Sequence, residues 1–267
     1  MAYATILADE SGGVLTLTLN RPQAKNAMSL EMVAELSTAL ADAEKAGNVR
    51  VIVLRGAGGT FCAGGDIADM AKVNAAPDDG PDLLAEVSRA FGEMCSAFSR
   101  TGIAIVAAVE GAALGGGFGL ACVADVTIAA SDAKFGLPET SLGIVPAQIA
   151  PALVERLGYG QAKRLAVLGG FVGAEEALRI GLVHEIAEDL DAAIARTVER
   201  ILRCAPSAVA ETKALLAAAR FSDPGGMVER AALSFSAAVR GEEGAEGTRA
   251  FMDKRSPRWA PPSPRSR

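Results

Sequence analysis

The chain has 267 residues, half of them hydrophobic but only 4% aromatic, and a formal net charge of −6. This length is ample for the core of one large domain or of a domain plus an extension, and that core must be built mainly from Ala, Val, Leu and Ile. The negative charge argues against a general polyanion-binding surface but leaves room for a local basic patch for one small anionic ligand, so no nucleic-acid partner is expected.

The cysteine pattern and the hydropathy of the chain predict a cytoplasmic protein. The four cysteines are scattered without a Cys-x-x-Cys pair, which favours reduced thiols over a disulfide framework or a zinc site. His184 is the only histidine, and we interpret it as an ordinary polar residue. The N-terminus lacks the pattern of a signal peptide, and the most membrane-like stretch, 102–124, is broken by Glu110 and several glycines. We therefore expect a buried strand plus helix there, and no membrane partner.

The first half of the chain alternates strands, glycine-rich loops and helices. Residues 14–19 predict a strand, and a helix follows with Ser29 as its N-cap and Gly47 as its stop. The apolar run 49–54 predicts a buried strand that leads into the glycine-rich loop 56–66.

The same order of elements continues further along. A helix is expected to begin near Asp66 and to run into a polar loop over 74–82, which is the most mobile-looking part of this half. A helix over 83–98 and strands over 103–109 and 125–130 follow. Strands that alternate with helices imply an α/β core whose ligand-binding groups lie on the loops after the strands.

Strands are expected to stop at about residue 187, and helices fill the rest of the chain. Leu215, Leu216 and nearby alanines make an apolar face that either the core or a second subunit must cover. The tail, 256–267, is rich in Pro, Ser and Arg, and its end is expected to be disordered. The predicted helices are 190–203, 207–220, 227–240 and 243–254.

The stretch ALGGGFGLA, residues 113–121, places four glycines in five positions. Because a glycine inside a helix costs about 1 kcal/mol relative to alanine, the cluster needs a reason. Three interpretations compete: a tight turn with close backbone packing, a phosphate cradle, or a bare backbone N–H at a helix start that faces a ligand oxygen. The cradle lacks its motif, since the Gly-x-Gly-x-x-Gly window that begins at Gly117 ends on Cys122.

The loops FCAGGDIADM and GAALGGGFGLA each follow a predicted strand. Each could present an N–H group at a helix start, and two such donors on one carbonyl oxygen make an oxyanion hole. An oxyanion hole is useful because it stabilises charge that develops only in the transition state.

Several long motifs resemble the crotonase, or enoyl-CoA hydratase/isomerase, superfamily over nearly the whole chain. The motifs are LNRPQAKNAMS, FCAGGDIADM, AVEGAALGGGFGLACVADVTIAASDAKFGLPETSLGIVP, AEEALRIGLVHEI and AFMDKRSPRW. The resemblance implies an α/β spiral of ββα turns and a helical C-terminal region that assembles a homotrimer, often a dimer of trimers. It also implies an acyl-CoA thioester ligand. We accordingly expect a core over residues 1–189 that holds the acyl-CoA site, and the helical region over 190–267.

The resemblance assigns the oxyanion hole to the N–H groups of Gly65 and Gly116. It places two lysines at the phosphates of coenzyme A and other residues along its adenine and pantetheine. Either lysine can equally be a solvated surface charge. No metal and no separate cofactor are implied, because coenzyme A is part of the substrate. The residues implied to contact it are Lys25, Ala63, Gly65, Asp66, Ile67 and Lys254.

Hydratases of this family carry two glutamates, and this chain departs from the pattern at the first, where it has Gly119. The second is Glu139. A glutamate after proline can simply open a helix, but beside the matched glycines the resemblance implies that Glu139 transfers the proton. Asp66 and Asp69 are better explained as residues of a first helical turn, and Glu110 is expected to be structural.

A second departure follows Pro146, where many hydratases have a glycine-rich run and this chain has AQIAP, residues 147–151. This variant resembles the branch that hydrates branched or carboxylated enoyl thioesters of the methylglutaconyl and isohexenylglutaconyl kind. Members of that branch also tolerate glycine at the first glutamate position. Gln148 could orient water or a substrate group, or make a hydrogen bond at a helix start.

The resulting hypothesis is an enoyl-CoA hydratase that adds water to a 2-enoyl-CoA with a single glutamate. A Δ3-Δ2 enoyl-CoA isomerase is the alternative, because one base can shuttle a proton between two carbons and needs no second carboxylate. A catalytically weak acyl-CoA-binding protein is a third hypothesis.

Overall fold

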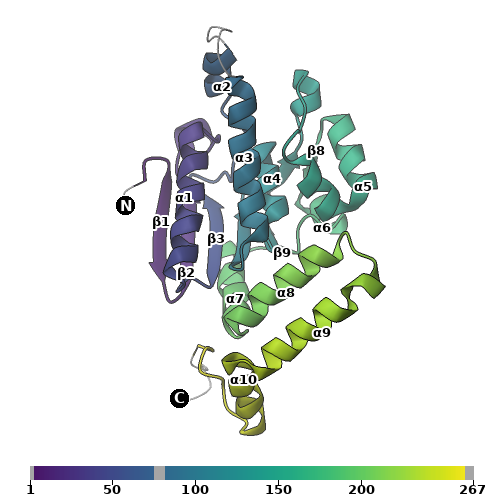
Figure 1. Cartoon of the computed structure of the whole chain (residues 1–267). Helices are drawn as coiled ribbons and strands as arrows, with labels where there is room; N and C mark the ends of the chain where they lie inside the picture. Colours follow the sequence, from purple (N-terminus) through teal and green to yellow (C-terminus); the bar gives the residue numbers. More distant parts are fainter. Residues whose placement is uncertain (1–2, 75–81, 262–267) are drawn as a thin grey trace.

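The computed structural model describes residues 3–74 and 82–261, which form an α/β core and a helical C-terminal arm (Figure 1). The large sheet has the order β1-β2-β3-β4-β6-β9, in which β1 pairs antiparallel with β2 and the other neighbours are parallel. A small sheet has the order β5-β7-β8. The strands are β1 (Ile6–Ser11), β2 (Val14–Leu19), β3 (Val51–Gly56), β4 (Ala104–Val109), β5 (Ala112–Leu114), β6 (Val126–Ala130), β7 (Lys134–Gly136), β8 (Phe171–Gly173) and β9 (Glu185–Ala187).

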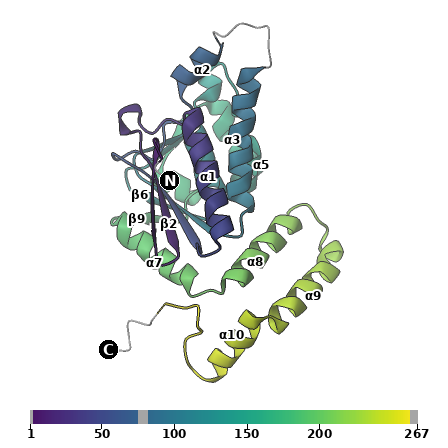
Figure 2. The same cartoon turned by 60° about the vertical axis from the view of Figure 1, so that its left-hand side comes forward.

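Helices cover both faces of the large sheet, α1 and α3 on one side and α7 on the other (Figures 1 and 2). The α-helices are α1 (Leu30–Ala46), α2 (Ile67–Asn74), α3 (Leu83–Arg100), α4 (Gly116–Val123), α5 (Ala150–Leu168), α6 (Ala174–Arg179), α7 (Leu190–Leu202), α8 (Pro206–Ala219), α9 (Pro224–Arg240) and α10 (Glu242–Met252). Two short 3-10 helices are η1 (Pro22–Ala24) and η2 (Glu139–Leu142).

Strand β3 shows how one apolar run serves two cores. Because successive strand residues point to opposite faces, Ile52 and Leu54 join the core under α1 and α3, and Val51 and Val53 join the core under α7. Parallel strands that are covered on both sides read as continuous apolar runs, as this one does. The carboxyl ends of β3 and β4 both lead into glycine-rich loops, which therefore lie at the same edge of the sheet.

Most of the predicted elements are present, and the boundaries of several move. The helix capped by Ser29 is confirmed as α1: the Ser29 hydroxyl accepts from Met32 N–H, and Gly47 ends the helix at a φ of 69°. The strand predicted at 49–54 begins two residues later, at Val51. The last strand, β9, ends at Ala187, as expected.

Strand β1 was not predicted. In the segment Ile6–Ser11 only Ile6 is buried, so no alternation of apolar and polar residues marks it as a strand. Its place at the edge of the sheet explains this composition, because an edge strand gains its order from backbone pairing with β2 rather than from a buried face.

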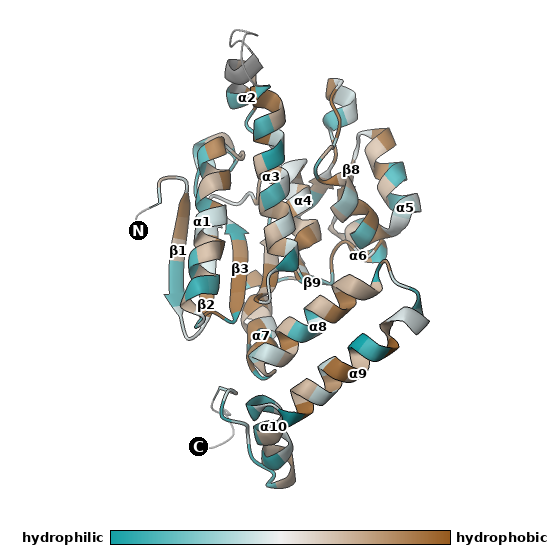
Figure 3. Ribbon diagram, in the orientation of Figure 1, coloured by the Kyte–Doolittle hydropathy of each residue, from teal (hydrophilic) through white to brown (hydrophobic). Residues whose placement is uncertain are grey.

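The C-terminal helices project from the core as an arm made of α8, α9 and α10 (Figures 1 and 2). Helices α8 and α9, both fully described, contain no buried residue, and Leu216 is 65% exposed. Apolar segments therefore lie open along the arm, as the brown stretches of α9 show (Figure 3). The large apolar side chains exposed there are Leu216, Phe221, Val228, Leu233, Phe235, Val239, Phe251 and Met252.

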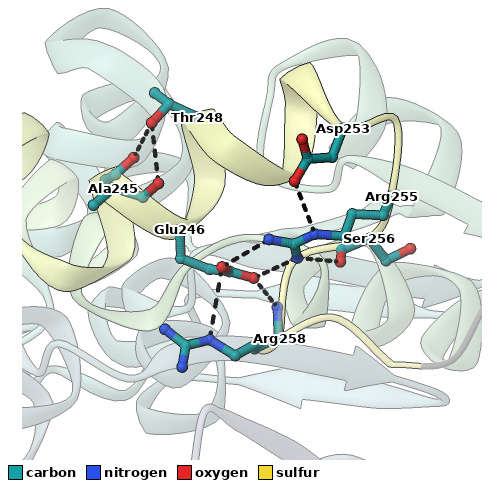
Figure 4. A network of polar contacts seen from close by, with 8 residues as sticks. Ala245, Glu246, Thr248, Asp253, Arg255, Ser256 and Arg258 are labelled. Atoms are coloured by element: carbon teal, nitrogen blue, oxygen red, sulfur yellow. Dashed lines mark hydrogen bonds and ion pairs between the residues drawn. The ribbon is translucent and has the colours of Figure 1, made fainter.

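An ion-pair network fixes the chain that follows α10. Arg255 donates to both carboxylate oxygens of Glu246, at 2.7 and 3.0 Å, and the backbone N–H of Arg258 donates to the same carboxylate (Figure 4). These contacts, the Arg255 hydrogen bonds foremost, lower the pKa of Glu246 to about 2. The resemblance motif AFMDKRSPRW thus contains residues that fold the tail back onto α10.

Some expectations lie outside the described residues, namely most of the polar loop at 74–82 and the end of the tail beyond 261. Among the residues that the structure describes, no helix is both long and apolar enough to cross a membrane. The described ranges also contain no group of three or more His, Cys, Asp or Glu side chains that could hold a metal ion.

Candidate active site

The two glycine loops lie against each other at the edge of the large sheet. Cys62 joins them, since its N–H donates to Ala112 O at 2.9 Å and its carbonyl accepts from Leu114 N–H at 2.9 Å. The backbones approach so closely that a Cβ built on Gly64 would lie 3.2 Å from the Leu114 carbonyl oxygen. An oxyanion hole formed by both loops requires them to be close, and the structure brings them together.

Gly65 keeps its backbone N–H free while both of its neighbours are bonded. Met28 N–H donates to Gly64 O at 2.8 Å, and Asp66 N–H donates to Met28 O at 3.0 Å, which is the pattern of a parallel bridge. In such a bridge the residue between the two bonded neighbours points its own N–H to the opposite side. Within residues 3–74 and 82–261, no hydrogen bond takes up the Gly65 N–H.

Gly116 has a free N–H for a different reason, because it is the first residue of α4 and the first N–H groups of a helix have no partner within it. Gly115 before it has a φ of 47° and donates to Gly136 O at 2.9 Å. Gly115 and Gly117 are buried, whereas Gly116 and Gly65 are only half-buried. No described group accepts from the Gly116 N–H, so both predicted donors have a free N–H on a half-buried residue.

Two of the three competing interpretations of the glycine cluster therefore fit the structure: tight packing and a free N–H at a helix start. A side chain is excluded by close backbone packing at Gly117, where a built Cβ would lie 2.6 Å from Cys62 O. At Gly115 the φ of 47° favours glycine, and a built Cβ would also lie 2.8 Å from Glu139 Oε1. The free N–H of Gly116 is compatible with the ligand-facing interpretation.

Glu139 is the first residue of η2, directly after Pro138, and its side chain turns toward Gly115. Its Oε2 is buried and has no hydrogen-bond partner in the described chain. Burial raises the pKa of this carboxyl above the ordinary glutamate value, with its own backbone N–H opposing the shift. Glu139 therefore opens a helical turn, as the simpler interpretation expected, but it also directs an unsatisfied carboxylate at the glycine loops.

The place where a side chain at position 119 would project is already filled. A Cβ built on Gly119 would overlap Ile149 Cγ2 and would lie 3.2 Å from Ile149 Cβ. Gln148 points elsewhere: its Nε2 donates to Ser88 Oγ on α3 at 3.1 Å, and no side chain caps the start of α5. Of the two roles expected for Gln148, the helix-start hydrogen bond is thus wrong.

The remaining walls around the two glycines are apolar. A Cβ on Gly116 would lie 3.2 Å from Phe91 Cζ and 3.4 Å from Met28 Cε, and one on Gly65 would overlap Met70 Cε. The sequence did not identify these three side chains, because their apolar residues at helical spacing are indistinguishable from ordinary core positions.

Only some of the residues predicted to contact coenzyme A lie close to one another. Lys25 lies beside the first glycine loop, since its carbonyl accepts from Ala63 N–H at 3.0 Å. Asp66 pairs with Arg21 at 2.8 Å and accepts from Asp69 N–H, which confirms its place at the start of a helix. Lys254 is not in this group: it follows α10 at the end of the molecule opposite α2 (Figure 1). Ile67, the last of the set, is 68% exposed beside Asp66.

Arg21 and Asn26 hold this region together, and sequence reasoning missed both. Asn26 is fully buried and donates to the carbonyls of Ala57 and Thr60, and its Oδ1 accepts from Arg21 N–H. These bonds tie the segment before α1 to the loop after β3. A polar residue between Lys25 and Ala27 gives no signal by itself that it will be buried.

Other titratable groups are structural. The His184 Nδ1 accepts from Thr127 N–H at 2.9 Å and Nε2 lies 2.9 Å from Arg156, and burial together with Arg156 lowers its pKa. The interpretation of His184 as a polar structural residue is confirmed. Burial raises the pKa of the Cys62 thiol to about 12, so it is not a thiolate nucleophile although it borders the glycine loops.

A separate hollow of about 310 Å³ lies between α1 and α3. Leu30, Val33, Glu93 and Met94 contribute to its lining, and none of the predicted site residues does. It is therefore distinct from the glycine loops, where the unpartnered donors and the carboxylate lie.

Comparisons with known proteins agree with this arrangement. The family model for enoyl-CoA hydratase/isomerase matches residues 9–262. A crotonyl-CoA hydratase of Syntrophomonas wolfei is 34% identical over 96% of this chain and 97% of its own. The 1,2-epoxyphenylacetyl-CoA isomerase of Escherichia coli is 35% identical over 74% of either chain.

Solved structures show the same fold. The crystal structure of an enoyl-CoA hydratase/isomerase from Marinobacter aquaeolei matches with a TM-score of 0.93 and 50% identity, over 96% of this chain and 99% of its own. The mixed α/β core with its parallel strands and the helical C-terminal region are thus those of the crotonase fold. The chain belongs to the enoyl-CoA hydratase/isomerase family, within the crotonase superfamily.

Proposed function

We propose that the protein adds water across the double bond of a 2-enoyl-CoA thioester, with Glu139 as the single carboxylate that moves protons. The observation that carries this proposal is the buried Oε2 of Glu139, which has no partner in the described chain and belongs to a carboxylate beside Gly115. A buried oxygen without a hydrogen bond costs stability, and it is retained where a ligand completes it.

The N–H groups of Gly65 and Gly116 supply the electrostatic part of the proposed reaction. With the thioester carbonyl oxygen between them, both donate to the atom on which negative charge develops. Donors that are fixed before the reaction stabilise the transition state more than the ground state, and α4 adds the positive end of its dipole at Gly116.

Glu139 supplies the proton transfers. As the water oxygen bonds to C3, the carboxylate takes one water proton and the electrons of the C2–C3 double bond move toward the thioester oxygen. When these electrons return, C2 takes the proton from Glu139, which ends as a carboxylate, and the product is a 3-hydroxyacyl-CoA. The raised pKa of Glu139 makes it a stronger base near neutral pH.

The proposed acyl group is branched or carboxylated. Two departures support it, glycine at position 119 and the AQIAP segment after Pro146. The apolar side chains of Phe91 and Ile149 beside the glycine helix α4 suit a branched carbon chain. The isomerase is the second candidate, and the absence of a second carboxylate at position 119 favours it.

Three CoA thioesters incubated with the protein in D₂O distinguish these functions. We expect crotonyl-CoA and 3-methylglutaconyl-CoA to give hydrated products with deuterium at C2, the second of them with the higher kcat/KM. If only 3-hexenoyl-CoA reacts, by migration of its double bond, the isomerase replaces the hydratase. Binding of all three thioesters without turnover would instead indicate a protein that has kept the pocket and lost the chemistry.

We also propose a homotrimer, alone or as a dimer of trimers, assembled through the C-terminal arm. The exposed apolar side chains of α8 and α9 support it, because large apolar patches seldom remain uncovered. In an assembly of this kind, Lys254 could approach a neighbouring subunit's site. Sedimentation equilibrium is expected to give three or six times the mass of one chain, and a single-chain mass at micromolar concentration would contradict the proposal.

A further inference from the structure

The segment 141–150, which runs from the end of η2 to the first residue of α5, is mostly exposed to solvent. In this stretch, all of which the structure describes, Ile149 is the one buried residue, at 3% exposure. Leu142 and Val145, which are equally apolar, are 59% and 72% exposed. Burial at Ile149 therefore reflects its specific position rather than the hydrophobicity of the segment.

Gln148 holds that position from the outside. Its Nε2 donates to Ser88 Oγ, and its Oε1 lies where a Cβ on Gly92 would stand, so the amide lies across one turn of α3. The next residue, Ile149, is thereby directed at α4, where its Cγ2 fills the space beside Gly119. Phe91, on the same stretch of α3, lies 3.8 Å from a Cβ built on Gly119.

Glu139 and Ile149 lie against two glycines that are one turn of α4 apart. Glu139 Oε1 is next to Gly115, Ile149 Cγ2 is next to Gly119, and these two glycines are joined by the Gly119 N–H to Gly115 O hydrogen bond of 3.0 Å. The volume where the family's hydratases carry a second carboxylate therefore contains a methyl group. A methyl group there offers water no hydrogen bond, whereas a second carboxylate would.

We propose that Ile149 is a positioning residue of the proton-transfer site, which excludes a side chain at position 119 and keeps bulk water, beyond the one substrate water, away from Glu139 so that one carboxylate does the work of two. The inference rests on the proposed function for its catalytic part only. Its steric part predicts that positions 119 and 149 are coupled whatever the reaction is. The two parts are tested separately.

The steric part is tested by thermal unfolding of Gly119→Ala, Ile149→Gly and the double variant. Glycine is tolerated at Ile149, which is the N-cap of α5. Gly119→Ala alone is expected to lower Tm, because its Cβ overlaps Ile149 Cγ2, and Ile149→Gly is expected to remove most of that loss. If the Tm changes of the two single variants add up to that of the double variant, the steric part is overturned, whatever the activity of the protein.

The catalytic part is tested by the pH profile of kcat/KM, on whichever thioester reacts fastest. In Ile149→Gly, bulk water gains access to Glu139, and the acidic limb is expected to move about half a pH unit or more toward the ordinary glutamate value. Ile149→Val keeps both γ-carbons, the Cγ2 methyl among them, and is expected to keep the wild-type limb. If the acidic limb does not move in Ile149→Gly, the proposed shielding of Glu139 is overturned. If the wild type turns over no thioester, that result counts against the proposed function but leaves the Tm result intact.

Discussion

Glu139→Gln is expected to lower kcat/KM by about 10²- to 10⁴-fold, which is the usual contribution of a positioned general acid–base group. Glutamine keeps the size of the side chain and can still donate and accept hydrogen bonds, but it cannot take a proton from water. The large loss is expected because Glu139 is the carboxylate that lies beside Gly115 and is the proposed carrier of both protons. A fold-change of this size corresponds to about 3 to 5 kcal/mol of transition-state stabilisation.

A matched control for this variant is Glu110→Gln, which removes the same charge from a residue near the same glycine segment. Its backbone carbonyl accepts from Phe61 N–H, and this bond survives the substitution. We expect a kcat/KM within about threefold of the wild type. If Glu139→Gln loses less than about tenfold, the proton transfer belongs to another group.

Gly116→Pro is expected to lower kcat by about 10²- to 10³-fold, because it removes one of the two proposed oxyanion donors. Proline is tolerated at the first position of a helix, where its missing N–H breaks no bond within the helix. The added carbon atoms do contact a neighbour, since a Cβ at this position lies 3.2 Å from Phe91 Cζ. The loss of activity must therefore be separated from the effect of that contact.

Gly116→Ala provides the separation, since it adds the Cβ and keeps the N–H. We expect it to retain at least about ten times the kcat of Gly116→Pro, with similar affinity for a CoA thioester in both variants. Comparable thermal midpoints would show that both variants fold. Equal activities in the two would mean that the N–H of Gly116 is not a donor to the substrate.

The alternation of strands and helices, the caps of α1 and the paired glycine loops were predictable because each leaves a local pattern. Ser29 and Gly47 are residues with strong positional preferences, and the continuous apolar run of β3 reflects burial on both faces. The two loops were predicted to act together because each follows a strand and could present an N–H group to one carbonyl oxygen.

The walls of the site were not predictable in the same way. Ile149 and Phe91 are apolar residues whose pattern resembles that of any core position, and their meeting at Gly119 depends on how α3, α4 and α5 pack. Asn26 is a polar residue whose burial depends on carbonyls about thirty residues away. Strand β1 lacks a buried face, so only its pairing with β2 reveals it.

The central claim is that one carboxylate, with two backbone N–H groups, adds water to an enoyl thioester. The most direct measurement is to convert crotonyl-CoA in H₂¹⁸O and to locate the label in the product by mass spectrometry. We predict 3-hydroxybutyryl-CoA with ¹⁸O at C3 from the wild type, formed at a greatly reduced rate by Glu139→Gln. The claim would be contradicted if the wild type left crotonyl-CoA without ¹⁸O but still moved the double bond of 3-hexenoyl-CoA.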